Sequence, residues 1–176
     1  MTSAARKRAS MLWPTSSDNS FTVSPARSAI ELTSAAALFR AYAKALPVDL
    51  APQGFGAELK SLPGPYAPPA GELLLAKRGD HVLGCIGLKA LAPPDVAEIK
   101  RLFVRPQARG TGVAKALVAD VLKLAQDRGY REVKLDTLAE MTPAIALYKS
   151  FGFAPIPPYG SHPYPGLVTL GKVLRT

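Results

Sequence analysis

The chain has 176 residues, 48% of them hydrophobic, which suits one globular domain with a substantial core and excludes a largely disordered protein. Its 22 basic and 13 acidic residues give a net charge of +9. This charge favours an anionic partner, but it does not choose between a polyphosphate, a nucleic acid and a membrane surface. The single cysteine, Cys85, excludes an internal disulfide and agrees with a cytoplasmic location, and no stretch is long enough for a membrane span.

Residues 1–20 are expected to form a flexible polar tail, and residues 21–176 a single domain. In the first part of this domain, the patterns predict a strand at 21–23, a helix at 30–46 that ends before Pro47, a shorter helix within 49–61, a hairpin of strands at 72–77 and 82–89, and a strand at 97–104. The first helix is expected to bury one apolar side, made of Ile30, Ala37, Leu38, Ala41, Tyr42 and Leu46.

The second part of the chain continues the alternation of strands and helices. It is predicted to contain a helix from Val113 to Gly129, a strand at 132–136, a helix that Thr142 caps and Gly152 ends, and strands at 153–156 and 167–173. The resulting order is β-α-α-β-β-β-α-β-α-β-β, which indicates the α/β (α+β) class. Cys85 lies among apolar residues and is expected to be a small buried side chain rather than a nucleophile.

The segment from Leu102 to Ala114 combines an apolar strand, a stop at Pro106, a turn that contains two glycines, and the start of a helix. The first N–H groups of a helix have no partner within the helix, and its dipole is positive at that end. Glycines let a ligand approach the backbone closely. The segment therefore predicts either a phosphate site or a corner that needs glycine for its geometry alone.

Two motifs identify a family resemblance. Gln107-x-x-Gly110-x-Gly112, within Arg-Gly-x-Gly-Val-Ala, and Leu147-Tyr148-x-x-x-Gly152-Phe153 resemble the GNAT family of N-acetyltransferases, in particular its small bacterial-type members. A Walker loop and a dinucleotide fingerprint both fit less well. The resemblance implies a mixed, mostly antiparallel central sheet with a V-shaped splay, flanked by about four helices. The sequence departs from a common subgroup after Tyr159, where Tyr-Tyr-x-Asn-Pro is replaced by Tyr-Gly-Ser-His-Pro.

The resemblance also implies acetyl-CoA as the co-substrate. Backbone groups of the strand at 102–104 would pair with the pantetheine arm as an added strand does, and the amides of the glycine turn would bind the pyrophosphate. No metal site is expected. The cofactor-binding residues implied in this way are Leu102, Phe103, Val104, Gln107, Arg109, Gly110, Thr111, Gly112, Val113 and Ala114.

Two residues are candidates for catalysis. By the resemblance, Tyr148 would protonate the leaving thiolate, although its position on an apolar helix face also suits a core tyrosine. Glu98 is the candidate base, because strand alternation puts it on the same face as Leu102 and Val104. The alternatives for Glu98 are an ion pair with the two following basic residues, at 100 and 101, and a base function carried by water instead.

The acceptor is expected to be a small-molecule or peptide amine, and residues 42–66 are expected to form one wall of its pocket. Neither a nucleic acid nor a membrane is expected as a partner, and the oligomeric state, a homodimer included, stays open. Two other functions compete with the acetyltransferase. One is a CoA-binding regulatory module with the same fold, and the other is a basic nucleic-acid-binding protein, which the charge alone suggests.

Overall fold

The computed structural model describes residues 20–160 and 164–174, so the predicted tail lies outside the described residues except for Ser20. The predicted element order is confirmed. The elements are β1 (Thr22–Pro25), α1 (Ala29–Ala45), η1 (Ala51–Gln53), α2 (Phe55–Ser61), η2 (Gly64–Tyr66), β2 (Glu72–Arg78), β3 (His81–Ala90), β4 (Val96–Val104), η3 (Pro106–Ala108), α3 (Val113–Asp127), β5 (Glu132–Leu138), α4 (Thr142–Ser150), β6 (Ala154–Pro155) and β7 (Leu167–Val173), with the three η elements being 3-10 turns.

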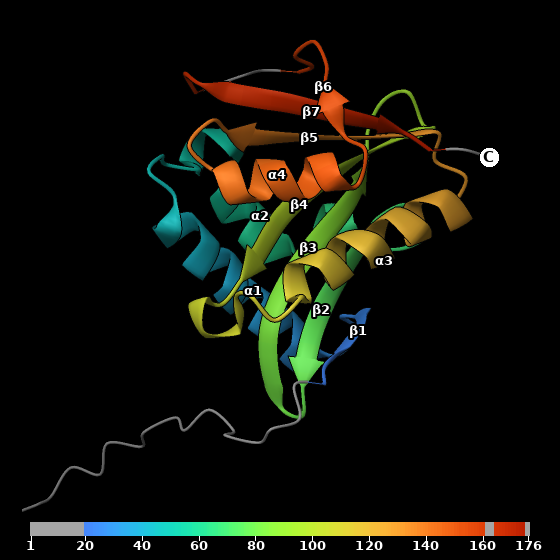
Figure 1. Cartoon of the computed structure of the whole chain (residues 1–176). Coiled ribbons are helices and arrows are strands. Elements are labelled where there is room, and N and C mark those ends of the chain that lie inside the picture. The colour runs from blue at the N-terminus through green and yellow to red at the C-terminus, as the bar shows by residue number, and fades with distance from the viewer. Residues whose placement is uncertain (1–19, 161–163, 175–176) are drawn as a thin grey trace, which may run out of the picture.

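The strands form one seven-stranded sheet in the order β1-β2-β3-β4-β5-β7-β6. Every neighbouring pair is antiparallel except β4 and β5, which are parallel. Helices α3 and α4 cover one face of the sheet, and α1 and α2 cover the other (Figure 1). The expected mixed, mostly antiparallel sheet between four α-helices is therefore confirmed. None of the helices within the described ranges is long and apolar enough to cross a membrane.

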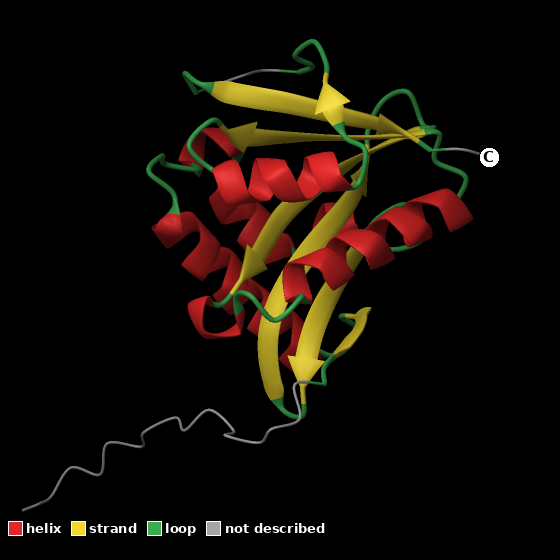
Figure 2. Cartoon of the chain, viewed as in Figure 1, coloured by secondary structure: helices red, strands yellow, loops and turns green. Residues whose placement is uncertain are grey.

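The two central strands separate soon after they meet. Strand β4 pairs with β5 only from Val96 to Glu98, opposite Glu132 to Lys134. Beyond this point the strands diverge, and each keeps a partner only on its outer side, β3 for β4 and β7 for β5 (Figure 2). This divergence is the V-shaped splay that the family resemblance implied. It leaves the inner edges of both strands without the backbone partners that a continuous sheet would give them.

A β-bulge in β4 changes which face its side chains occupy. Between Lys100 and Phe103 the strand carries one residue more than β3 does, and Arg101 in this bulge has a φ of 59°. Such a bulge reverses the alternation of side chains. Ile99 and Val104 consequently lie in the same core, whereas Glu98 faces the opposite side of the sheet. The prediction that Glu98 shares a face with Val104 is wrong, because it assumed uninterrupted alternation.

The inward side of α1 also differs from the prediction. The buried residues of this helix are Ala35, Leu38 and Phe39, and Ile30 is 80% exposed. Leu38, Ala41 and Tyr42 do face the core as predicted, but Ile30 and Ala37 are exposed. The helix is rich in alanine, so its neighbouring faces are almost equally apolar and the pattern did not separate them fully. Helix α4 begins at Thr142 with Met141 as its cap, so Thr142 is not the capping residue that was expected.

Candidate functional site

The glycine turn presents a group of unpaired backbone amides. Gly110 and Gly112 have φ values of 76° and 86°, a region that favours glycine, and Gly112 is the N-cap of α3. The first helical amide with an acceptor is that of Ala116, which donates to the Gly112 carbonyl at 3.0 Å. Among the described residues, no acceptor contacts the amides of Gly110, Thr111, Gly112, Val113, Ala114 and Lys115.

Neighbouring side chains stabilise this turn and leave its outer side open. The Thr111 hydroxyl donates to the Ala108 carbonyl at 2.6 Å, and the Arg109 Nε donates to the Val104 carbonyl at 3.2 Å. Gln107 and Arg109 are exposed, and a Cβ added at Gly110 would meet no atom within 4 Å. The turn is therefore an open set of N–H donors beside a guanidinium group, which is the chemistry that binds a phosphate or pyrophosphate.

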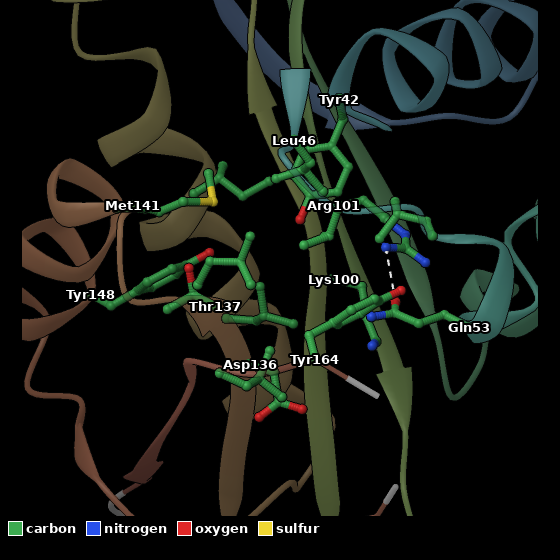
Figure 3. A pocket seen from close by; sticks show the side chains of 17 residues that line it. Tyr42, Leu46, Gln53, Lys100, Arg101, Asp136, Thr137, Met141, Tyr148 and Tyr164 are labelled. Carbon is green, nitrogen blue, oxygen red and sulfur yellow. Dashed lines mark hydrogen bonds between the residues drawn. The ribbon is translucent and has the colours of Figure 1, made fainter. Parts of the chain in front are cut away.

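A cavity occupies the splay, and side chains from both sides of the sheet line it (Figure 3). Residues of α4 line it from one face, and residues of α1 and the following connection line it from the other. Between them lie the diverging edges of β4 and β5. The lining residues are Tyr42, Leu46, Val48, Leu50, Gln53, Ile99, Lys100, Arg101, Leu102, Asp136, Thr137, Leu138, Met141, Ala144, Tyr148, Tyr164 and Leu167.

Tyr148 reaches this cavity from α4 (Figure 3). Its ring is 5% exposed and packs edge-on against Phe153, with the ring centroids 5.5 Å apart. Among the described residues, the structure gives its hydroxyl no hydrogen-bond partner. Burial, with a smaller contribution from the charge of Tyr42, raises the pKa of Tyr148, so the hydroxyl keeps its proton at neutral pH. The residue is thus both a core tyrosine and a neutral hydrogen-bond donor at the cavity wall.

The strand residues implied in cofactor binding do not all point to the same side. Leu102 lines the cavity, and Val104 is buried in the core beneath α3 and α4. Phe103 is buried on the opposite face, where its ring packs edge-on against Tyr42 at a centroid distance of 6.4 Å. Phe103 can therefore contribute only backbone groups to a ligand that lies on the α3 and α4 side.

Glu98 lies away from Tyr148, in a second cavity on the α1 and α2 face. It is 3% exposed, accepts a hydrogen bond of 2.9 Å from the Tyr159 hydroxyl, and contacts the ammonium groups of Lys89 and Lys100 at 3.2 and 3.4 Å. The ion pair with Lys100, which was one of the alternatives for Glu98, is present. Burial, followed by the negative charge of Glu98, raises the pKa of Tyr159, so this tyrosine remains a donor.

The alternative in which Glu98 pairs with Arg101 is wrong, because the bulge directs Arg101 to Glu58. Its guanidinium donates to both Glu58 carboxylate oxygens, at 2.6 and 3.0 Å, and to Gln53 at 3.3 Å. Tyr66 donates to the same carboxylate at 2.5 Å. Burial raises the pKa of Glu58, but the hydrogen bonds and charge of Arg101 outweigh it, so the pKa lies below its ordinary value. This network joins α2 to the splay.

The two cavities adjoin each other, because Gln53, Lys100, Asp136 and Leu167 line both. Tyr42, Leu50 and Gln53 come from the 42–66 region that was expected to form an acceptor wall. Sequence reasoning gave Tyr42 only as a helix residue in the 42–66 region and assigned no site role to Asp136. That the two residues line one cavity depends on the splay, which the tertiary fold creates.

Cys85 is a free cysteine in the core. The Cys85 side chain is fully buried, as expected, and its thiol donates to the Arg101 carbonyl at 3.3 Å. Burial raises the pKa of this thiol to about 12, which leaves almost no thiolate at neutral pH. Within 20–160 and 164–174, no group of three or more metal-ligating side chains is present.

Comparison with known proteins identifies the family. The model of the acetyltransferase (GNAT) family matches residues 36–153. An uncharacterized N-acetyltransferase of Schizosaccharomyces pombe is 38% identical over 133 residues, which are 74% of this chain and 81% of the relative.

Solved structures share the fold. A GNAT acetyltransferase from Staphylococcus aureus superimposes with a TM-score of 0.74 at 18% identity, covering 89% of this chain and 100% of the other. The PaiA N-acetyltransferase of Thermoplasma acidophilum, solved in complex with coenzyme A, gives a TM-score of 0.69 at 17% identity, covering 88% of this chain and 99% of the other. With a family model that spans more than half of its residues and a relative that matches most of its length, the protein belongs to the GNAT family and is an N-acetyltransferase.

Proposed function

We propose that the protein transfers an acetyl group from acetyl-CoA to a primary amine by direct attack of the amine on the thioester. The observation that carries this proposal is the cavity in the splay, which has Tyr148 at its wall and is lined by residues from both faces of the sheet. The unpaired amides of residues 110–115 support it, because they suit the diphosphate of CoA. The Thermoplasma neighbour, which was solved with coenzyme A, adds the fold-level analogy.

In this proposal the turn and strand β4 hold the co-substrate, and acetyl-CoA supplies an activated acyl group when bound. The unpaired amides from Gly110 to Lys115 bind the diphosphate, and the exposed Gln107 and Arg109 side chains lie at its edge. Backbone groups of Leu102, Phe103 and Val104 bind the pantetheine arm along the inner edge of β4, which β5 leaves unpaired beyond Glu98. A backbone N–H of this edge stabilises the negative charge that develops on the thioester carbonyl oxygen.

Glu98 removes the proton that blocks attack. An alkylamine has a pKa of about 10.4, so at neutral pH most of it is protonated and has no free electron pair. Glu98 lies on the acceptor side in this proposal, and its carboxylate can receive this proton directly or through water in the second cavity. The base and the acid thus act from opposite faces of the sheet.

Tyr148 acts on the leaving group. As the bond between the amine nitrogen and the acyl carbon forms, the carbon–sulfur bond breaks, and the Tyr148 hydroxyl gives its proton to the thiolate. The amine loses two protons in all. One goes to Glu98 before attack, and the other returns to Tyr148 or to solvent, so the reaction releases one proton along with free CoA thiol and the amide. No acyl-enzyme is needed, which agrees with the burial of Cys85.

The test is a thiol-release assay with acetyl-CoA and a library of primary amines, combined with calorimetry of CoA binding. We expect CoA to bind and at least one amine to release free thiol in proportion to the acetylated product. Binding of CoA without turnover for any amine would support a regulatory module instead. The absence of both binding and turnover would contradict the proposal entirely.

A further inference from the structure

Tyr42 lines the cavity in the splay, yet the proposed reaction gives it no part. It comes from α1, on the face of the sheet opposite α4 and Tyr148. Figure 3 shows the two tyrosines reaching into the cavity from opposite sides. The charge of Tyr42 contributes to the raised pKa of Tyr148, which agrees with this proximity. Tyr42 therefore lies on the side from which the acceptor approaches in the proposed reaction.

Two residues of β4 fix the ring of Tyr42. The Phe103 ring packs edge-on against it, with the ring centroids 6.4 Å apart, and the Arg101 guanidinium carbon lies 5.9 Å from its centroid. Leu102, between these two in the strand, lines the cavity and belongs to the edge that holds the pantetheine arm in the proposed reaction. The Tyr42 side chain consequently has a fixed place beside this edge.

Arg101 is in turn held by the elements that follow Tyr42. Its guanidinium donates to both carboxylate oxygens of Glu58 and to Gln53, and it lies 5.3 Å from the centroid of the Phe55 ring. These partners come from η1 and α2, so one side chain joins β4 to the wall on the acceptor side. The φ of 59° at Arg101 is unfavourable for a residue other than glycine, and these contacts offset that cost.

The chemistry of the Tyr42 hydroxyl suits a contact with an amine. Burial raises the pKa of Tyr42 more than the neighbouring Arg101 lowers it, so the hydroxyl keeps its proton at neutral pH and is not a base. A neutral phenol oxygen accepts hydrogen bonds from N–H groups. When a fixed acceptor holds one N–H of a neutral amine, the free electron pair of the nitrogen takes a defined direction.

We propose that Tyr42 binds the acceptor, with its hydroxyl oxygen accepting an N–H of the amine while the free electron pair of the nitrogen faces the thioester carbonyl carbon. Arg101 is the positioning residue, because it holds the Tyr42 ring beside β4. This inference rests on the proposed acetyl transfer. No proton moves to or from Tyr42, so Glu98 and Tyr148 keep their roles as base and acid.

The first experiment measures Tyr42→Phe in the thiol-release assay with the best primary amine of the library. This change keeps the ring and removes the hydroxyl. We expect kcat/KM for the amine to fall by about five- to 100-fold, because an N–H of the amine loses its acceptor. The KM for the amine should rise, whereas the KM for acetyl-CoA and the affinity for CoA in calorimetry should stay unchanged. Tyr130→Phe, whose ring lines neither cavity, is the matched control and should leave all these values unchanged.

A double-variant cycle tests whether Arg101 acts through Tyr42. Arg101→Lys keeps a cation beside Glu58 but loses the bidentate geometry, so kcat/KM for the amine should fall by about fivefold or more. In the Tyr42→Phe background the same change should lower it by less than about twofold, because the contact that Arg101 positions is already lost. Arg128→Lys weakens another buried ion pair, with Glu72 and outside both cavities. As the control, it should lower the unfolding temperature and leave the KM for the amine unchanged.

Three results would overturn the inference. Unchanged kinetics with the amine in folded Tyr42→Phe would refute the contact with the acceptor and leave the N-acetyltransferase function standing. Loss of CoA affinity in the same variant would assign Tyr42 to the co-substrate instead. Fully additive effects in the double variant would refute the positioning role of Arg101. The lack of thiol release by the unaltered protein with every amine would instead contradict the acetyl transfer on which the inference rests.

Discussion

Replacing Tyr148 by phenylalanine tests the proposed acid with little disturbance to the fold. The change removes a hydroxyl that has no hydrogen-bond partner among the described residues, and it keeps the ring that packs against Phe153. We therefore expect the free energy of unfolding to change by less than about 0.5 kcal/mol. The affinity for CoA should also stay the same, because the proposed diphosphate and pantetheine contacts come from other residues.

The catalytic effect should be much larger than the effect on stability. General acid catalysis contributes about 100- to 10,000-fold, so kcat of Tyr148→Phe should fall by that factor, which corresponds to about 2.7–5.5 kcal/mol of transition-state stabilisation. Thiol release with saturating acetyl-CoA measures it, and calorimetry with CoA confirms that binding is retained. A variant that keeps more than a third of the wild-type kcat would refute the role of Tyr148 as the acid.

Tyr130→Phe provides the matched control. The Tyr130 hydroxyl donates to the Ala70 carbonyl at 2.7 Å, so its loss removes a real hydrogen bond and should cost about 1 kcal/mol of stability. Because Tyr130 lines neither cavity, kcat should remain within twofold of wild type. The two tyrosine variants should thus show opposite patterns, one losing activity without stability and the other losing stability without activity.

The pH dependence offers a second check on Tyr148. Burial raises its pKa above the ordinary value of about 10, so the acid stays protonated throughout the range in which the protein can be assayed. The rate should therefore show no alkaline decline near pH 10 that depends on this residue. A decline with an apparent pKa near 10 that Tyr148→Phe abolishes would show that the hydroxyl is in contact with water.

Three further changes test other parts of the molecule. Gly110→Asp should weaken CoA binding by about tenfold or more in calorimetry, because it brings a carboxylate to the unpaired amides. Gly110→Ala should lower the free energy of unfolding by only about 1–2 kcal/mol through backbone strain, since its Cβ meets open space. Arg101→Met should lower the free energy of unfolding, measured with denaturant, by about 3–5 kcal/mol, because it leaves the Glu58 carboxylate buried and charged. The double variant with Glu58→Gln should recover part of this loss. Hydrogen bonds, the largest from Lys77, lower the pKa of Glu31 to about 2. The free energy of unfolding of wild type should therefore exceed that of Glu31→Gln by its full amount above about pH 5, and this difference should vanish as the pH falls toward 2.

Local patterns were enough to predict the order of elements. Helix α3 was predicted accurately because its apolar positions repeat at helical spacing and Gly112 and Gly129 flank it. The turn before this helix was also predictable from local sequence. Glycines indicate positive φ values, and the first amides of any helix lack partners within the helix. These features depend on residues that are close together in the sequence.

The site was less predictable wherever it depends on distant residues. The bulge at Arg101 carries no glycine to mark it, yet it decides that Glu98 and Val104 lie on opposite faces. The partner of Arg101 is Glu58, which is 43 residues away, and nothing in either local sequence indicates the pairing. The mixed charge of the second cavity likewise appears only when β5 is brought beside β4, so composition and spacing could not reveal it.

Residues from both faces of the sheet line the cavity in the splay, so in the proposed reaction donor and acceptor approach from opposite directions and meet only at their reacting ends. A bisubstrate compound, in which a short acyl linker joins CoA to the acceptor amine, could then thread the gap between β4 and β5 and occupy both halves together. Such a molecule would gain affinity from each half through a single binding event, and its acceptor portion could be varied until it reports which amine the protein prefers.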